Sequence, residues 1–524
     1  MTVTGTTTPV KGASTRRWRV LSNTVTPRTR LIDQVRDEPA ALVLGAAIVV
    51  WTIVFSALDV LRQNRYRTID FDLGIHDQAI WLLAHGRVFD TVRGLPVFGH
   101  HATFAYYLLV PFEWLGGGPN IWNLLQVLAL STSAIPIYLL ARQRLLNPWW
   151  ALGLSIVWLL QPPLQFFAWE TFHPEVMAIP FILWAYWFGE NRRWLAFAVL
   201  LVLAMTWKED VSLLVVGLGV LYVIRGRRRV GALVIAGGLA WFLIVGAWLV
   251  PHLAGGGTVY GGLYGDLGST PADVLKTGLT HPGQIVQRLS DNNAGGYVRD
   301  ILAPFGFTPL AAPEMLLLGL PQALVNLLST ANFTYDLRYH YQALPMVALG
   351  LGMVEGVARL RRLAERRRWG DSPVRFVVGF ASACALAATV AWGPSPLGVD
   401  FQNGYWPLSV SADATARDQM LPAIGSQDGV SADYYTVPHL THRSIVYTFP
   451  NPWENKNYGI STSAIGDPAK VKWILVDTSL FQPSDSVLFN RLIATEFTVR
   501  QRMGTVVLAE RTRPPTTLAG PAAP

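Results

Sequence analysis

The apolar stretch AALVLGAAIVVWTIVFSAL (residues 40–58) contains no charged side chain. A helix of about 20 apolar residues spans the hydrocarbon core of a bilayer, which is roughly 30 Å thick. The stretch therefore predicts a transmembrane helix. Six arginines precede it, and basic residues flanking a span favour the cytoplasmic side. The N-terminus is therefore expected in the cytoplasm, following Arg16, Arg17, Arg19, Arg28, Arg30 and Arg36.

The composition of the whole chain supports a membrane protein. The 524 residues are 51% hydrophobic and 15% charged, and the mean hydropathy is +0.32. Soluble proteins carry roughly a quarter of their residues as charged side chains, so this chain requires an apolar solvent. The net charge of +8 comes from short arginine clusters between apolar runs. This pattern indicates membrane topology, and no nucleic-acid partner is expected.

Further apolar runs predict about eleven transmembrane helices in an α-helical polytopic fold. After the first helix, they are expected at residues 120–140, 148–160, 174–188, 194–206, 211–224, 230–250, 298–311, 313–328, 342–358 and 374–392. The run at 101–115 is short for a crossing and is expected to be re-entrant or interfacial. Two long polar segments, at about 62–101 and 252–297, are expected outside.

The arginine clusters agree with this topology. With eleven spans and a cytoplasmic N-terminus, four clusters face the cytoplasm: Arg142/Arg144, Arg192/Arg193, Arg225/Arg227/Arg228/Arg229 and Arg359/Arg361/Arg362/Arg366/Arg367/Arg368. A group on the outer side, Arg62, Arg65 and Arg67, departs from the pattern, which long loops are free to do. The odd number of spans leaves the C-terminal segment outside.

Three regions follow from these patterns. Residues 1–39 are expected to be a disordered basic cytoplasmic tail, and residues 40–392 the transmembrane domain. Hydropathy falls from about residue 393, where strands are predicted at Trp473–Asp477 and 505–508 with a helix at 484–495 between them. Residues 393–524 are therefore expected to be a small α/β extracytoplasmic domain. The single cysteine, Cys384, excludes an intramolecular disulfide.

Polar motifs gather on the predicted outer face. Ionisable side chains close to a membrane are costly and commonly mark a functional cavity. Five segments contribute them: Asp70, Asp72, His76 and Asp77 in TIDFDLGIHDQAIW; His100 and His101 in FGHHATF; Glu170, His173 and Glu175 in WETFHPE; Lys208, Glu209 and Asp210 in WKED; and Arg338, His340 and Tyr341 in RYHY.

The aspartates of the first motif are the candidate catalytic residues. In an extended stretch, the spacing of Asp70 and Asp72 places both carboxylates on one face. One carboxylate is then a candidate general base, or the pair is a candidate site for a divalent cation. Asp72 is equally suited to capping a helix that begins near Leu73. Residues 72–85 would form an amphipathic helix on the membrane surface, in which Asp77 would be either a substrate-binding residue, like His76, or a solvated position.

The histidine motifs admit several interpretations. His100 and His101 are candidates for lining a polar substrate site or holding a metal, but also for ordinary loop histidines. His173 and Glu175 flank Pro174, a favoured first helical residue. The positive end of that helix is suited to an anion, although an acidic first turn alone also explains Glu175.

Two cationic motifs are candidates for binding phosphate. Lys208 is suited to contact a phosphate as a point charge, while Glu209 or Asp210 would orient it or bind a sugar hydroxyl. A solvated turn explains the same three charges. Arg338 and His340, together with the three outer arginines, would form a cationic patch for a lipid phosphate headgroup or simply anchor the chain to headgroups.

The order of these motifs resembles one family of bacterial polytopic membrane proteins, catalogued as a domain of unknown function. The resemblance covers residues 45–360 and runs through FDLGIHDQAIW, FGHH, FHPE, WKED, a Pro-Glu segment at 312–314 and RYHY. It continues in the outer C-terminal stretches VSADYYTVPHLTHRSIVYTFP and WILVD. That family is distantly similar to the GT-C glycosyltransferases. The resemblance implies a bacterial plasma-membrane location.

The GT-C similarity implies a reaction. Such enzymes pass a sugar from a polyprenyl-phosphate donor in the outer leaflet to an extracytoplasmic acceptor, using a carboxylate in the first outer loop. Asp70 and Asp72 occupy that place. The FGHH motif replaces a more usual His-x-Ser-Pro, which weakens any role for His100.

The alternative function is a transporter or flippase of lipid-linked or small polar substrates, and a structural partner of envelope enzymes is a third. Transporters place charges near the bilayer midplane and often contain inverted repeats. Here the charges lie at one face and no repeat is evident, which favours the transferase. Asp72 or Asp70 would then be the general base, and Lys208, Arg338 and His340 would stabilise the departing phosphate. No cofactor is certain, and a divalent cation is left open.

Overall fold

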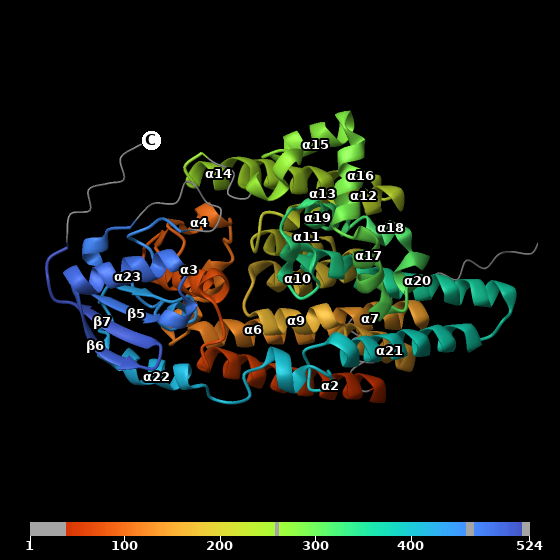
Figure 1. Cartoon of the computed structure of the whole chain (residues 1–524). Helices are drawn as coiled ribbons and strands as arrows, with labels where there is room; N and C mark the ends of the chain where they lie inside the picture. Colours follow the sequence, from red (N-terminus) through yellow and green to blue (C-terminus); the bar gives the residue numbers. More distant parts are fainter. Residues whose placement is uncertain (1–37, 257–260, 457–465, 516–524) are drawn as a thin grey trace, which may run out of the picture.

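The computed structural model describes residues 38–256, 261–456 and 466–515 (Figure 1). Nearly all of the predicted N-terminal tail lies outside these ranges. The described chain is mostly helical, with long helices side by side and a five-stranded sheet beside one end of them. The other end is formed by the tips of α20 (Ala343–Arg367) and α21 (Ser372–Trp392).

The first predicted span is the helix α2 (Pro39–Asn64), which begins with proline at a position where its missing N–H costs nothing. One face buries Leu44, Trp51 and Phe55 against the other helices. The opposite face exposes large apolar side chains, including Leu42 and Ile53. An exposed apolar face of this length requires lipid around it, as the sequence predicts.

Within the described ranges, five helical segments are long and apolar enough to cross a membrane. They are Pro39–Asn64, Pro119–Leu145, Arg228–Leu253, His340–Arg367 and Ser372–Trp392. A sixth candidate is a pair of helices bent by 45°, α8 (Pro148–Leu159) and α9 (Pro162–Glu170). Two further apolar helices in the described ranges are shorter, α11 (Trp194–Met205) and α12 (Val211–Ile224), and α10 (Pro174–Glu190) has 17 residues.

The prediction of continuous spans at 298–311 and 313–328 is wrong. This region is broken into α17 (Ala294–Leu302), α18 (Pro313–Leu316), α19 (Leu320–Leu328) and short 3-10 turns. The longest of these helices has nine residues, and about 20 are needed to cross a bilayer. Prolines at positions 304, 309, 313 and 321 each favour a new helix start over continuation.

The segment predicted to form the first outer loop, called the first outer segment below, folds into short elements. A π-helical turn η1 (Asp70–Gly74) leads into α3 (Ile75–Ala84), and a hairpin of β1 (Phe89–Asp90) and β2 (Leu95–Pro96) leads into α4 (Val97–His100) and α5 (Tyr106–Trp114). All residues of α3 from Ile75 to Leu83 are buried. The prediction of an amphipathic surface helix is therefore wrong, because α5 and the C-terminal segment cover the faces expected to meet water.

The second outer segment is also helical. It contains α14 (Val250–Leu253), η3 (Gly261–Leu267), α15 (Pro271–Thr280) and α16 (Pro282–Asp291). Thr270 caps α15 through a reciprocal hydrogen-bond pair with Asp273, which satisfies two otherwise unpaired backbone N–H groups.

The C-terminal segment forms a mixed sheet with strand order β4-β3-β5-β7-β6. β3 (Val430–Ala432) pairs in parallel with β4 (Val446–Thr448) and β5 (Trp473–Asp477), and β7 (Val506–Arg511) pairs antiparallel with β5 and β6 (Phe497–Met503). The predicted strands at Trp473–Asp477 and 505–508 are confirmed as β5 and β7. The helix predicted between them is α23 (Pro483–Thr495).

The sheet packs directly on the first outer segment (Figure 1). Ile75 and Val92 join Val430 and Leu475 in one apolar core on the face that also receives α22 (Ala412–Met420). Arg67 donates to Asp413 at 3.1 Å, and the Tyr66 hydroxyl donates to Asp418 at 2.7 Å. The C-terminal segment thus completes a core that the outer segment cannot close alone.

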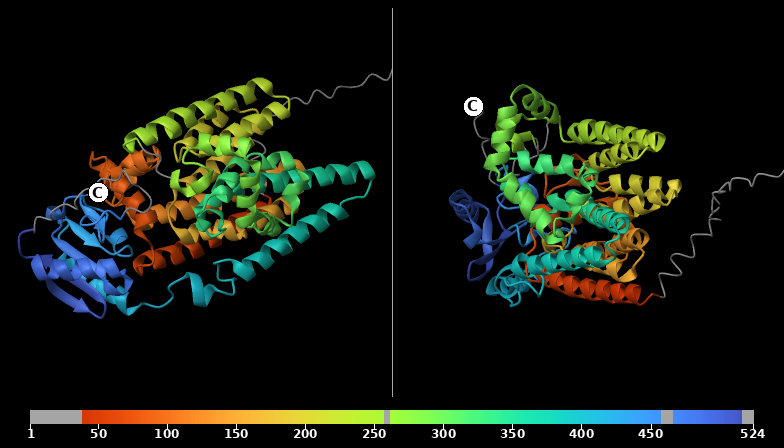
Figure 2. Two further views of the ribbon diagram at one scale, coloured as in Figure 1. Left: turned by 45° about the horizontal axis from the view of Figure 1, so that its top comes forward. Right: turned by 90° about the vertical axis from the view of Figure 1, so that its right-hand side faces the viewer.

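The arginine clusters between helices lie far from the sheet. Arg144, Arg225, Arg227, Arg359 and Arg362 surround a hollow of about 350 Å³ at the other ends of the long helices. Glu190 and Glu355 neutralise part of this charge, with 2.9 Å between Arg144 and Glu355. Figure 1 and the left view of Figure 2 show the sheet and the α20–α21 tips at opposite ends of the molecule.

Candidate functional site

The candidate catalytic aspartates separate at the π-helical turn η1. The sequence predicted an extended stretch with both carboxylates on one face, but helical backbone rotates each residue by about 100°. Asp70 and Asp72 therefore point to different neighbours. The capping alternative is also wrong, because Gly74 rather than Asp72 precedes the first residue of α3.

Asp72 faces the helix bundle. Its Oδ1 lies 3.4 Å from His173 Nε2, and its side chain keeps 24% of its surface exposed. Burial disfavours the charged carboxylate, but the imidazoles of His173 and His340 and the guanidinium of Arg62 outweigh burial and lower the pKa of Asp72. Asp72 is therefore an ionised carboxylate that solvent or a substrate can still reach.

Asp70 faces the C-terminal sheet instead. Its carboxylate accepts a hydrogen bond from the Thr448 hydroxyl on β4, and its backbone N–H donates to Tyr434 O at 3.0 Å. Burial raises the pKa of Asp70 to about 7, more than the Thr448 hydrogen bond lowers it. The structure thus places Asp70 at a contact between segments, away from the polar cluster.

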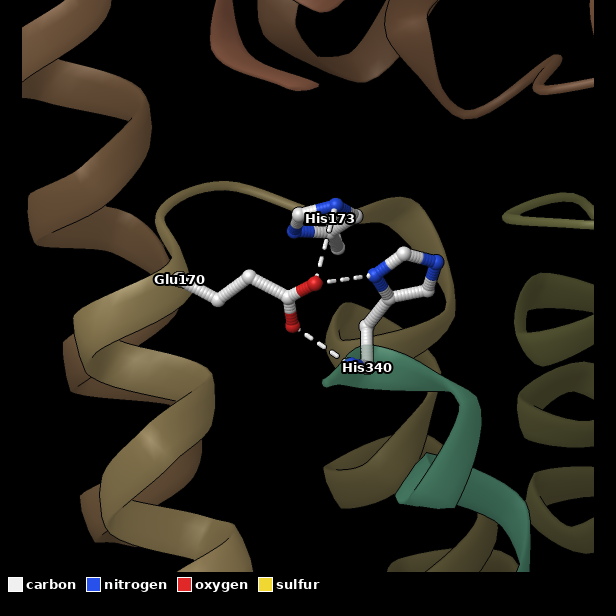
Figure 3. Close-up of side chains that lie close together, drawn as sticks. All are labelled: Glu170, His173 and His340. Atoms are coloured by element: carbon white, nitrogen blue, oxygen red, sulfur yellow. Dashed lines mark hydrogen bonds and ion pairs between the residues drawn. The ribbon is translucent and has the colours of Figure 1, made fainter. Parts of the chain in front are cut away.

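Glu170, His173 and His340 form the centre of the cluster (Figure 3). Glu170 ends α9, His173 precedes α10, and His340 begins the turn before α20. His340 Nδ1 lies 2.6 Å from Glu170 Oε1, and the His340 backbone N–H donates to the other carboxylate oxygen. The two imidazoles stack with centroids 3.9 Å apart. Three helix ends thus meet at one carboxylate.

His173 carries positive charge in this environment. Burial lowers its pKa, but the Glu170 and Asp72 carboxylates outweigh burial and raise the pKa of His173 to about 9. Pro174 begins α10 as the sequence predicted, and Glu175 lies in its first turn.

Lys208 extends the cluster from His340. His340 Nε2 lies 3.4 Å from Glu175 Oε1, which lies 2.5 Å from Lys208 Nζ. Asp210 Oδ2 lies 3.7 Å from the same ammonium. Burial lowers the pKa of Lys208, but Asp210, Glu175 and Glu209 together raise it well above its usual value. The solvated-turn interpretation of the WKED motif is wrong for Lys208, which is buried.

The other histidines flank this cluster. His76 Nδ1 lies 2.5 Å from the Tyr106 hydroxyl, and its ring meets the His173 ring edge-on at 5.7 Å. Burial lowers the pKa of His76 well below its usual value, which keeps it neutral. His101 Nδ1 lies 2.7 Å from Glu209, next to Lys208, while the His100 ring lies 4.4 Å from the His101 ring.

The remaining predicted residues lie apart from the cluster around Glu170, His173 and His340, or at its edge. Asp77 is buried against Trp122 and His442, so the solvated position predicted for it is wrong. Arg338 forms an exposed ion pair with Asp336 at 2.6 Å. Tyr341 lies beside the His340 ring at 4.1 Å. Of the three outer arginines, Arg65 and Arg67 contact the C-terminal segment, whereas Arg62 lies over the Trp169 ring at 4.3 Å.

The central residues are suited to a divalent cation. One donor atom from each of Glu170, His173 and His340 lies within 4.8 Å of the others. Imidazole and carboxylate donors together suit zinc or a similar transition metal. Carboxylates also outnumber the lysine and arginine side chains around this cluster, which favours a bound cation.

The sequence of the chain matches a known family. The family described as "Predicted membrane protein (DUF2079)" matches residues 64–501. The chain belongs to the DUF2079 family. No curated protein sequence matches the chain. The DUF2079 match begins at the last residue of α2 and includes the whole polar cluster and the sheet as far as β6. The resemblance predicted from the ordered motifs is therefore confirmed.

The sequence motifs included Glu170 and Arg62 but not Tyr106, which also contacts the DUF2079 cluster. Tyr106 and Arg62 contact it from α5 and α2, and Glu170 is its central carboxylate. Glu170 was visible within WETFHPE. Tyr106 lies in an apolar run, where a single tyrosine gives no signal of function.

Proposed function

We propose that this DUF2079 protein is a GT-C-like membrane glycosyltransferase of the bacterial plasma membrane. It would transfer a sugar from a polyprenyl-phosphate donor to an extracytoplasmic acceptor. The observation that carries the proposal is the unbroken chain of contacts from Asp72 through His173, His340 and Glu175 to Lys208. It joins an accessible carboxylate to a buried ammonium at one end of the helices.

The proposed topology has nine crossings. They are α2, α6 (Pro119–Thr132) with α7 (Ala134–Leu145), α8–α9, α10, α11, α12, the helix from Arg228 to Leu253, α20 and α21. The two broken segments are removed from the eleven predicted spans, and the number of crossings remains odd. The four arginine clusters still fall in the cytoplasm, and the chain of contacts and the sheet fall outside.

Asp72 is the proposed general base. The acceptor hydroxyl gives its proton to Asp72 while its oxygen bonds to the anomeric carbon of the sugar. The bond between that carbon and the phosphate oxygen breaks, and the lipid phosphate leaves with the electron pair. Asp72 is suited to this role because it is ionised and partly exposed, whereas Asp70 is enclosed by Thr448.

Positive charge beside Asp72 supports departure of the phosphate. Lys208 and the protonated His173 would stabilise the lipid phosphate, with Arg62 and His340 next to them. A divalent cation on Glu170, His173 and His340, when bound, would take the place of the proton on His173 and supply positive charge at the same point. Arg338, paired with Asp336 and half-exposed, is placed at the rim. The C-terminal sheet, which packs on the segment that carries Asp72 through Phe71 and Ile75, would bind the acceptor.

The test uses purified protein in liposomes with radiolabelled polyprenyl-phosphate sugars and cell-envelope acceptors. Asp72→Asn keeps the side-chain size and removes the base, and should lower the transfer rate by about 100-fold or more. Asp70→Asn is the matched control, two residues away, and should retain transfer. Normal transfer by Asp72→Asn would remove Asp72 from the mechanism. Movement of the lipid-linked sugar across the bilayer without transfer would instead support a flippase.

A further inference from the structure

A second cluster of ionisable side chains lies outside the proposed active site. It joins Asp77 on α3, Glu113 on α5 and His442, which follows the turn η10 (Val437–His439) in the C-terminal segment. His442 Nε2 lies 3.3 Å from Asp77 Oδ2, and His442 Nδ1 lies 3.6 Å from Glu113 Oε1. Three segments from two parts of the sequence thus meet at one point.

The two carboxylates of this cluster are buried, and the imidazole of His442 is the one group in contact with both that can carry a positive charge among the described residues. The Asp77 side chain is fully buried and that of Glu113 is 6% exposed, while His442 is 38% exposed. Asp77 is contacted by neutral donors, the Trp122 indole N–H at 2.6 Å and the Thr441 hydroxyl. His85 and Arg443 also face the cluster, but they act at longer range. Buried carboxylates require a nearby cation, since removing their charge from water is costly.

Glu113 provides an independent observation. Its Oε2 is buried and has no hydrogen-bond partner among the residues that the structure describes. Buried oxygen atoms are nearly always paired, so an unpaired oxygen on a carboxylate whose other oxygen faces His442 indicates a missing ligand. The oxygen needs a positive partner, and the cluster has two carboxylates to neutralise.

We propose that Asp77, Glu113 and His442 bind a divalent transition-metal ion, with zinc the best suited. One donor atom from each residue lies within 4.8 Å of the others. The 3.3 Å between His442 Nε2 and Asp77 Oδ2 is close to the separation expected for two ligands about 2.0–2.1 Å from one zinc ion. Two carboxylates and one neutral imidazole balance a divalent charge, and the exposed side of His442 leaves room for water as a fourth ligand.

The metal would fasten the C-terminal segment to the outer helices. His442 comes from the segment that forms the sheet, whereas Asp77 and Glu113 come from helices more than 300 residues earlier in the chain. The Trp81 ring lies 6.4 Å from the His442 ring, and Trp122 orients Asp77, so the ligands already have fixed neighbours. The site is separate from Asp72 and Lys208 and does not depend on the proposed transfer reaction.

The test measures metal directly in the full-length protein. The protein is purified in detergent, stripped with a chelator, reloaded with zinc and analysed by mass spectrometry for bound metal. His442→Gln should lose one zinc per chain relative to the wild type, or bind it more than about tenfold more weakly. His340→Gln alters the other histidine cluster and should retain the zinc at His442, so the double variant His340→Gln with His442→Gln should bind one zinc per chain fewer than His340→Gln alone.

A second measurement needs no variant. Cobalt bound to the wild-type protein should give visible absorption of a tetrahedral site, and zinc should displace it. Zinc should also protect the C-terminal segment from limited proteolysis, and His442→Gln should remove that protection. Retention of all zinc by His442→Gln, or a wild-type protein that binds no metal here, would overturn the proposal. The latter result would mean that protons alone neutralise the two carboxylates.

Discussion

The ion pair between Lys208 and Glu175 gives the sharpest test of the polar cluster. The two side chains are 9% and 5% exposed, and their charged atoms lie 2.5 Å apart. Lys208→Met preserves the length and apolar stem of the side chain but removes its charge. Glu175 would then remain buried without its ammonium partner, and Asp210 would lose the same neighbour.

The expected cost follows from burial. Removing one partner of a buried ion pair typically costs about 3–5 kcal/mol, because the other charge is left unpaired away from water. Arg338→Met is the matched control, since it breaks the pair of Arg338 with Asp336 in which the arginine is 49% exposed. An exposed pair contributes about 0–1 kcal/mol. Lys208→Met should therefore be clearly less stable than Arg338→Met.

The assay is denaturant unfolding of the purified protein in mixed micelles, followed by tryptophan fluorescence. The double variant Lys208→Met with Glu175→Gln should recover part of the stability, because it removes the orphaned charge as well as its partner. Equal stability of Lys208→Met and Arg338→Met would refute the burial of this pair. A double variant that is no better than the single one would refute its pairing with Glu175.

Three further outcomes are expected from the structure. The pKa of Asp70 rises from 3.8 to about 7 on folding, so the folded state binds this proton more tightly than the unfolded state. The free energy of unfolding should therefore fall by up to about 4 kcal/mol as the pH rises from about 4 to 7. Asp70→Asn should flatten this pH dependence in unfolding curves, and the same pH dependence in the variant and the wild type would contradict the prediction. A Cβ at Gly356 on α20 would meet the Thr308 carbonyl, so Gly356→Ala should lower the free energy of unfolding by about 1–3 kcal/mol. A Cβ at Gly379 on α21 meets nothing within 4 Å, so Gly379→Ala should leave the free energy of unfolding unchanged or raise it slightly in the same assay. Arg417 is fully buried among three aspartates, so Arg417→Met should expose the sheet to limited proteolysis while leaving the helices protected; unchanged cleavage would contradict this.

Membrane character and the polar motifs were readable from the sequence. The lipid-facing side of α2 follows from the absence of charge at residues 40–58, because long apolar runs have no stable place in water. The strand Trp473–Asp477 was also predicted, since a short β-branched and aromatic run bounded by polar residues favours a strand. Local chemistry is sufficient for features of this kind.

The pairing of the site residues was decided by tertiary structure alone. Whether Asp72 faces His173 and Asp70 faces Thr448 depends on the π-helical turn between them, and alternation in sequence gives no sign of that turn. The same holds for His442, whose partners Asp77 and Glu113 lie far away in the sequence. The sequence specifies which segments enter lipid, because the free energy of transferring a segment from water to lipid is the sum of the contributions of its own residues. Which side chains share a proton, a charge or an ion depends on how distant segments pack, and only the folded chain brings them together.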